Sequence, residues 1–353
     1  MRIIHLVSNR VWGGGEQYVL DLATEFAAKG CKVSVVSRGV DAVAGRFKAA
    51  GLPVTTMALK GAIDIVSPFK LARIIAGDEP VIIHVHNFKD ATTAVRARAL
   101  SRNKGVRIVM TRHLVKKAKQ SALYNRLDAM IFVSHLACSE FMSCAPVIDA
   151  AKVHVIHNSI KLQPTATTES RPAEGVTYMF HGRLSPEKGI DTLLQAFAMA
   201  ATPHARLVIA GSGNKEYVER LHDMAHESGI AQQITWAGHV SDIHPLIQKA
   251  DVGVCPSHVR EAGSLSVLEY MAHGKPVVAS NNGSQPEYIT HGKDGLLVQP
   301  GDVAALAAAI KSLGDAQQRQ AIGKAAQKTF EERLAFPIFI AKIEKVYRAV
   351  SGK

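Results

Sequence analysis

Two glutamates, Glu261 and Glu269, stand eight residues apart in the stretch EAGSLSVLEYMAHGKPVVASNNG. Between them, Gly263 and Ser264 precede a predicted helix that begins at Leu265, with Ser264 as its N-cap. Backbone amides at a helix start favour an anion such as a phosphate. A carboxylate about one turn further along can accept hydrogen bonds from a pair of sugar hydroxyls. The spacing therefore predicts a short helix that binds a diphosphate at its start and a ribose diol at Glu269.

Two strands must position this helix. An apolar run at 250–257 precedes Glu261, and a second at 276–280 follows the helix, which we expect to end at Gly274. Short apolar runs of this kind are typical of buried parallel strands. Ligands of open α/β sheets bind outside the carboxyl ends of the strands. We therefore expect Glu261 to face such a crevice.

Cationic and glycine-rich turns follow other predicted strands. Arg183 and Lys188 come after a strand at 176–181, and a planar guanidinium with a point-charge ammonium suits a diphosphate. Glycines that admit close approach of backbone amides to a ligand follow the predicted strands at 2–7 and 207–210. They are Gly14 and Gly15 after the first strand, and Gly211 and Gly213 after the second. The first turn lacks the G-x-G-x-x-G pattern, which disfavours a nicotinamide dehydrogenase.

Two histidines end the buried strand predicted at 80–87. Strand alternation places His84 and His86 on one face of the sheet. We expect His84 to be a core residue. Only His86 is expected to clear the strand end and reach the crevice.

The chain has 353 residues, of which 47% are apolar and 20% charged, values typical of a globular protein with two domains. The first residues predict a strand rather than a signal peptide, and no apolar run is long enough to span a bilayer. The four cysteines lack C-x-x-C spacing, and neither metal-site spacing nor a D-x-D pair occurs. We therefore expect a cytoplasmic protein without a metal ion or a cofactor.

Excess positive charge is confined to the first half. Residues 1–164 hold 23 Lys and Arg against 11 Asp and Glu, whereas residues 165–353 hold 19 against 19. Between 96 and 126 there are ten basic residues and no acidic one. The centre of this run predicts a contact with an anionic membrane surface or another anionic partner, although a solvated charged face is the alternative. The residues concerned are Arg112, His113, Lys116, Lys117 and Lys119. The scarcity of aromatic residues in this run disfavours nucleic acid.

The E-x7-E pattern followed by A-x-G-K-P-V-V-A-S, together with G-R-L-x-x-x-K-G at 182–189, resembles the retaining GT-B glycosyltransferases of family 4. The resemblance implies two doubly wound Rossmann-like α/β domains facing a cleft. The first, at 1–164, would bind the acceptor and the second, at 165–335, the donor. A C-terminal helix at about 336–353 would cross back to the first domain. The family's N-G turn reads Asn158-Ser159 here, a departure from its pattern.

Residue roles also follow from the resemblance. Arg183 and Lys188 would bind the donor diphosphate, the glycine turn at Gly14 and Gly15 would close over it, and Gly211 and Gly213 would belong to the donor site. Backbone groups of His239 and Val240 would contact the nucleobase. His86 and Glu261 would contact the transferred sugar, and Glu269 the ribose.

The implied reaction moves a sugar, with retention and without a metal, from a nucleotide diphosphate sugar (a UDP-sugar foremost) to a glycan or lipid-linked glycan. Such a reaction belongs to the synthesis of cell-surface polysaccharide or lipopolysaccharide, by an enzyme peripheral to the membrane. One alternative is a non-catalytic protein that binds an anionic polymer through its basic half. Another is a GT-B enzyme that acts as a phosphorylase or an epimerase.

Overall fold

The computed structural model describes residues 1–117, 121–144, 148–162, 175–200 and 204–352. The chain forms two compact units: unit 1 comprises Met1–Asn158 with Phe336–Lys353, and unit 2 comprises Ser159–Ala335. The sequence analysis placed this boundary at residue 164. The division comes earlier because Ser159 Oγ donates to the Leu334 carbonyl at 2.5 Å and Ile160 is buried in the core of unit 2.

Unit 1 contains a parallel sheet of seven strands in the order β3-β2-β1-β4-β5-β6-β7. Its central strands are continuous apolar runs, as expected of strands covered on both faces. The strands are β1 (Arg2–Val7), β2 (Lys32–Ser37), β3 (Val54–Thr56), β4 (Val81–Val85), β5 (Val106–Arg112), β6 (Ala129–Phe132) and β7 (Val153–Val155). The helices between them are α1 (Gly14–Ala28), α2 (Asp41–Ala49), α3 (Val66–Ile74), α4 (Phe88–Leu100) and α5 (His135–Met142).

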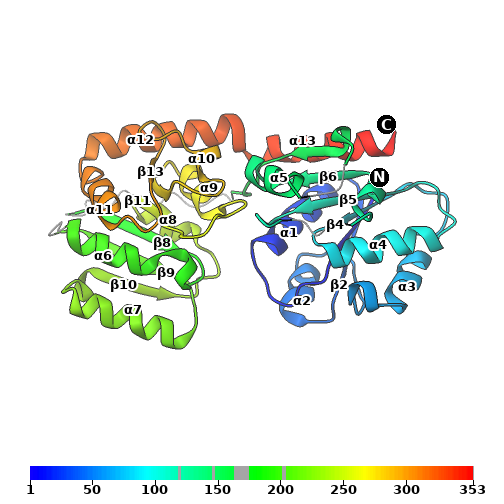
Figure 1. The fold of residues 1–353 in the computed structure, drawn as a ribbon, viewed down its shortest axis with the longest axis horizontal. Coiled ribbons are helices and arrows are strands. Elements are labelled where there is room, and N and C mark those ends of the chain that lie inside the picture. The colour runs from blue at the N-terminus through cyan, green and yellow to red at the C-terminus, as the bar shows by residue number, and fades with distance from the viewer. Residues whose placement is uncertain (118–120, 145–147, 163–174, 201–203, 353) are drawn as a thin grey trace. The chain divides into compact units, whose positions relative to one another are not determined.

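The last helix, α13 (Phe336–Ser351), belongs to unit 1, as the sequence predicts (red in Figure 1). Its apolar face packs into the core of that unit through Phe339, Ile343 and Tyr347. The Tyr347 hydroxyl lies 2.6 Å from Nδ1 of His84, whose Nε2 lies 2.7 Å from Thr111 Oγ1. His84 is completely buried. It is therefore a core histidine with both nitrogens paired.

Tyr347→Phe should lower the free energy of unfolding by about 1–3 kcal/mol, because it leaves Nδ1 of the buried His84 without a partner. Lys345→Ala on the same helix alters only an exposed side chain and serves as the control. Urea denaturation followed by circular dichroism measures both. Equal stability of Tyr347→Phe and wild type would show that this hydrogen bond does not anchor the helix.

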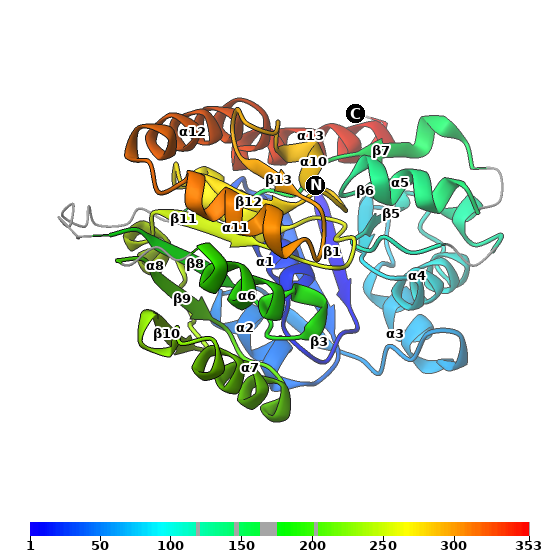
Figure 2. The same ribbon diagram turned by 60° about the vertical axis from the view of Figure 1, so that its left-hand side comes forward.

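Unit 2 repeats the architecture with a parallel sheet of six strands in the order β10-β9-β8-β11-β12-β13. Figure 2 shows β8 with β9 on one side and β11 on the other. The strands are β8 (Thr177–His181), β9 (Arg206–Ala210), β10 (Ile234–Gly238), β11 (Val252–Cys255), β12 (Val277–Ser280) and β13 (Leu296–Val298). The helices are α6 (Ile190–Ala200), α7 (Lys215–Glu227), α8 (His244–Lys249), α9 (Leu265–Ala272), α10 (Gln285–Tyr288), α11 (Val303–Ser312) and α12 (Ala316–Thr329).

Each sheet has a point where the strand order reverses. In unit 1 this point is β1, between β2 and β4, and in unit 2 it is β8, between β9 and β11. Successive connections leave such a point on opposite faces of the sheet, and the loops that follow the two strands there diverge around a crevice. Of the turns predicted to bind ligands, those after β1, β4, β8 and β11 lie at these reversal points, whereas those after β9 and β10 lie further along the sheet of unit 2.

No helix in the described part of the chain is both long and apolar enough to cross a bilayer.

Candidate functional site

The two glutamates lie where unit 2 reverses its strand order. Glu261 is in the loop after β11, and Glu269 is on α9, which begins at Leu265 as predicted. Ser264 occupies the N-cap position, but its side chain makes no capping hydrogen bond. The predicted strand–loop–helix–strand unit is therefore present.

Lys188 and Glu261 form an ion pair, with Nζ and Oε1 2.7 Å apart. Lys188 ends a short 3-10 helix (Pro186–Lys188) after β8, so the pair joins the loops of two neighbouring strands. Ser257 Oγ also donates to Oε1 of Glu261. Both charged side chains are mostly buried, which weakens screening by solvent. The structure thus brings together two residues that the sequence assigned separately.

Glu269 contacts a residue that the sequence analysis did not assign. Its Oε2 lies 2.5 Å from Nε2 of His181, the last residue of β8. Nδ1 of His181 lies 2.8 Å from the Tyr270 hydroxyl, which donates to the Met179 carbonyl at 2.8 Å. This series of hydrogen bonds orients the imidazole of His181 and, through it, the carboxylate of Glu269. The only signal in the sequence was a histidine at the carboxyl end of a predicted strand.

Groups for an anion remain available beside this network. Arg183 is exposed, and within the described ranges it forms no ion pair. The backbone amides of Gly263, Ser264 and Leu265 make none of the hydrogen bonds found among the described loops and caps. A guanidinium and the free amides of a helix start are donors that bind a diphosphate in proteins.

Close packing against backbone carbonyls of unit 2 requires glycine at both positions after β9, Gly211 and Gly213. A Cβ atom on Gly211 would lie 1.8 Å from the Gly182 carbonyl oxygen, and one on Gly213 would lie 2.0 Å from that of Leu184. Leu184 and Gly213 also form a β-bridge. The two glycines therefore dock their turn against the loop that carries Arg183. His239 is exposed and Val240 half-buried after the edge strand β10, two strands from β8.

Gln285 is a further polar residue near this site. It is completely buried, and neither end of its carboxamide has a hydrogen-bond partner within the described chain. A Cβ atom on Gly283 would lie 2.5 Å from the Glu261 amide nitrogen and 2.8 Å from Oε1 of Gln285. Buried polar groups are usually paired. The carboxamide therefore adds unpaired polar atoms beside the Glu261 loop.

In unit 1, a row of histidines lies at the carboxyl ends of β4 and β5. His86 Nε2 lies 3.3 Å from Nδ1 of His5, and His86 Nδ1 lies 3.3 Å from Nε2 of His113. The rings of His5 and His113 stack on either side of the ring of His86. Both nitrogens of His86 are therefore engaged within the protein. Gly14 and Gly15 open α1 after β1, and a Cβ atom on Gly15 would meet open space.

Three histidines of this row have the composition of a metal site. Nitrogens of His5, His84 and His86 lie within 4.8 Å of one another. However, the two nitrogens of His84 are held by Tyr347 and Thr111, so coordination through either one would break a buried hydrogen bond. Burial lowers the pKa of all three imidazoles, so the row is packed and neutral.

Burial lowers the pKa of His113 to about 4 and holds the pKa of His86 well below its usual value, with the neighbouring histidines adding to the second effect. Both imidazoles should therefore stay neutral down to pH 5, as imidazole ¹⁵N chemical shifts will test. Because their folded pKa values lie below the unfolded value of about 6.5, they reduce stability as the pH falls from 6.5 towards 4. Titration of either ring near pH 6.5 would contradict this picture.

Several cations of the basic run at 96–126 contact other groups of unit 1. Arg98 pairs with Asp128 at 2.6 Å, and Arg107 Nε donates to the Val350 carbonyl at 2.9 Å. Arg112 is half-buried, with its guanidinium 4.9 Å from the centre of the Phe141 ring. Lys116 and Lys117 are exposed, as is Leu114. Lys119 lies outside the described residues.

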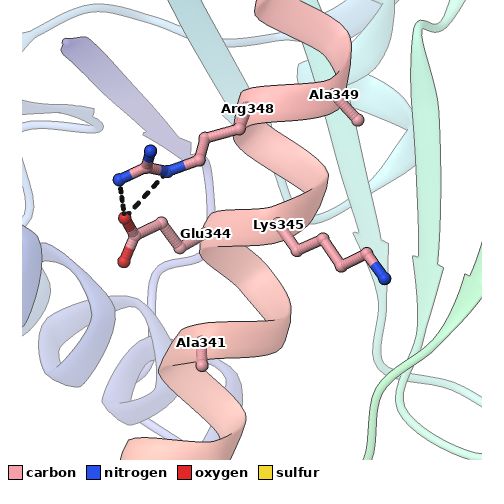
Figure 3. A pocket seen from close by; sticks show the side chains of 5 residues that line it. All are labelled: Ala341, Glu344, Lys345, Arg348 and Ala349. Atoms are coloured by element: carbon pink, nitrogen blue, oxygen red, sulfur yellow. Dashed lines mark hydrogen bonds and ion pairs between the residues drawn. The ribbon is translucent and has the colours of Figure 1, made fainter. Parts of the chain in front are cut away.

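A hollow of about 470 Å³ lies over α13 (Figure 3). Two of its charged side chains pair with each other, since Arg348 donates two hydrogen bonds to Glu344. Glu344 also pairs with Lys29 at 3.1 Å. Alanines line much of the remainder. This hollow offers no group suited to the chemistry of the loops described above.

Comparisons with known proteins agree with this geometry. Residues 12–163 match the family described as Glycosyltransferase Family 4, and residues 168–329 match Glycosyl transferases group 1. The chain belongs to the group 1 glycosyltransferases. The second match contains every assigned residue of unit 2, from Arg183 to Glu269.

Curated relatives align over part of this chain. A glycogen synthase of Mycobacterium tuberculosis is 29% identical over 265 residues, which is 69% of this chain and 63% of the relative. A GDP-mannose-dependent phosphatidylinositol monomannoside mannosyltransferase of the same organism is 31% identical over 63% of this chain and 62% of its own length.

Solved structures share the fold over almost the whole chain. Anabaena HepE, solved with UDP and glucose, superposes with a TM-score of 0.84 at 22% identity, covering 99% of this chain and 100% of HepE. The lipopolysaccharide outer core galactosyltransferase WaaB superposes with a TM-score of 0.77 at 16% identity, covering 99% of each chain. These likenesses confirm the GT-B fold that the sequence predicts.

Proposed function

We propose that this protein transfers a sugar, with retention at the anomeric carbon, from a nucleotide diphosphate sugar to a glycan or lipid-linked glycan. The observation that carries the proposal is the convergence of Lys188, Glu261, Glu269 and the α9 amides at the reversal point of unit 2. This convergence supports a donor site made of a cation, free amides and two carboxylates. A UDP-sugar is the proposed donor, in line with the UDP bound to HepE.

Each group has a distinct part in the proposed reaction. Arg183, Lys188 and the amides of Gly263–Leu265 stabilise the charge that builds on the leaving diphosphate, a role that a metal ion has in other enzymes. The diphosphate replaces the Glu261 carboxylate as the partner of Lys188. Glu269, oriented by His181, accepts hydrogen bonds from the ribose diol.

Unit 1 is proposed to bind the acceptor. Its excess positive charge favours an anionic acceptor or one embedded in an anionic membrane. One relative is named a phosphatidylinositol monomannoside mannosyltransferase, and another a lipopolysaccharide core biosynthesis glycosyltransferase. We propose the same class of acceptor, with the enzyme peripheral to the membrane.

The test is product analysis with a panel of labelled UDP-, GDP- and ADP-sugars, with and without a lipid extract. We expect transfer from one nucleotide series into the lipid fraction, and proton NMR of the product should show the donor's anomeric configuration. Inversion would contradict the retaining mechanism. Release of sugar phosphate only, or interconversion of donor sugars, would support the phosphorylase or epimerase alternative.

A further inference from the structure

Unit 1 displays large apolar side chains on a short segment between β3 and β4. Ile63, Ile65, Val66 and Phe69 are 80%, 66%, 55% and 58% exposed, respectively. These four residues, called here the exposed apolar segment, fall within seven consecutive positions. Scattered single apolar residues on a surface need no explanation, but a contiguous group indicates an interaction site.

The exposed apolar segment is held in place by its own buried polar residue. Asp64, only 4% exposed, accepts hydrogen bonds from the amides of Lys60 and Ser67, at 2.9 Å each. Leu59, just before, has a φ of 45° and donates its amide to Ser67 Oγ at 3.2 Å. A non-glycine residue in the left-handed region is strained unless its surroundings fix it. The loop is therefore shaped to present these apolar side chains outward.

Positive charge surrounds this segment. A hollow of about 740 Å³ next to Ile63 is lined by Arg10, Arg38, Lys60 and Lys89, with no acidic residue in its wall. Lys70 and Arg73 continue the positive charge along α3 and are exposed. Asp64, the only acidic residue between 57 and 77, is turned inward. Apolar side chains beside exposed lysines are the composition of an interfacial membrane contact.

We propose that the exposed apolar segment enters the interface of an anionic lipid bilayer, where Lys60, Lys70 and Lys89 contact the headgroups. This inference rests on the membrane-borne acceptor proposed above and assigns the contact to 60–70 and the start of α4, instead of the basic run at 112–119. The cations favour a lipid surface over a second copy of the chain, because two such positive surfaces would repel each other.

Vesicle sedimentation tests the assignment without any donor or acceptor. Wild type should bind vesicles of equal parts phosphatidylglycerol and phosphatidylcholine, and bind pure phosphatidylcholine far less. Ile65→Ser/Phe69→Ser should lower the partition coefficient roughly ten-fold or more. Lys60→Gln/Lys70→Gln should lower it several-fold in low salt and little at high salt. Met199→Ser, which alters an exposed methionine of unit 2, should behave as wild type.

Wild-type binding by Ile65→Ser/Phe69→Ser would overturn the proposal. So would a loss of binding confined to Lys116→Glu/Lys117→Glu, which would assign the contact to the other basic run. Dimerisation in analytical ultracentrifugation that the serine variant abolishes, without vesicle binding, would identify a second copy as the partner. UDP binding by calorimetry is expected to be unchanged in every variant, so a failure here is distinct from a failure of the proposed transferase activity.

Discussion

Arg183→Ala and Lys188→Ala are each expected to lower the rate of sugar transfer by about 10²–10³-fold, because each removes a donor that stabilises the leaving diphosphate. Turnover of the preferred sugar nucleotide measures the loss. Lys215→Ala removes an exposed lysine on α7 and should leave turnover unchanged. Turnover near the wild-type rate in either variant would refute the assignment of the diphosphate site.

Lys188→Ala also leaves the Glu261 carboxylate without its cation, which is expected to reduce stability. The double variant Lys188→Ala/Glu261→Gln removes both charges and should regain thermal stability without regaining turnover. Recovery of turnover together with stability would mean that Lys188 acts only by holding the fold.

The second prediction is that substitutions of Glu261 and Glu269 impair different steps. Glu269→Gln should weaken binding of the nucleotide diphosphate by about ten-fold or more, because it disrupts both the ribose contact and the hydrogen bond to His181. Glu261→Gln should leave nucleotide binding nearly intact and lower turnover instead. Calorimetry with the nucleotide alone and steady-state kinetics together measure the difference. Equal loss of nucleotide affinity in both variants would contradict these roles.

Much of the donor site could be predicted because its residues are close in sequence to elements with strong local signals. The helix start at Ser264 and Leu265, the helix stop at Gly274 and the apolar runs of β11 and β12 depend on local spacing alone. The turn after β8, from Arg183 to Gly189, likewise has a strong local pattern. These patterns place Glu261 and both cations after strand ends, and Glu269 on the helix that follows Glu261.

Pairings between distant segments could not be predicted. The Lys188–Glu261 ion pair joins residues 73 positions apart, and the Glu269–His181 contact joins residues 88 apart. Each depends on β8 and β11 being neighbours in the sheet, which no local pattern specifies. The row formed by His5, His86 and His113 depends on the order of three strands in the same way.

The exposure of individual side chains could not be predicted from the sequence either. The basic run at 96–126 predicts a charged surface, but Arg98, Arg107 and Arg112 contact other groups of the fold. The membrane contact of Lys116 and Lys117 stays a prediction. The exposure of Ile63, Ile65, Val66 and Phe69 accompanies a loop held by the buried Asp64, which no local pattern specifies.

The central claim is that unit 2 binds the diphosphate of a nucleotide sugar through Lys188, Arg183 and the start of α9. Calorimetric titration of UDP, GDP and ADP into wild type and Arg183→Ala/Lys188→Ala, with EDTA present throughout, tests it directly. We predict that wild type binds one of the three nucleotides in the micromolar range without a metal ion, and that the double variant loses at least ten-fold in affinity. Absence of binding by all three nucleotides, or equal affinity in the double variant, would contradict the account.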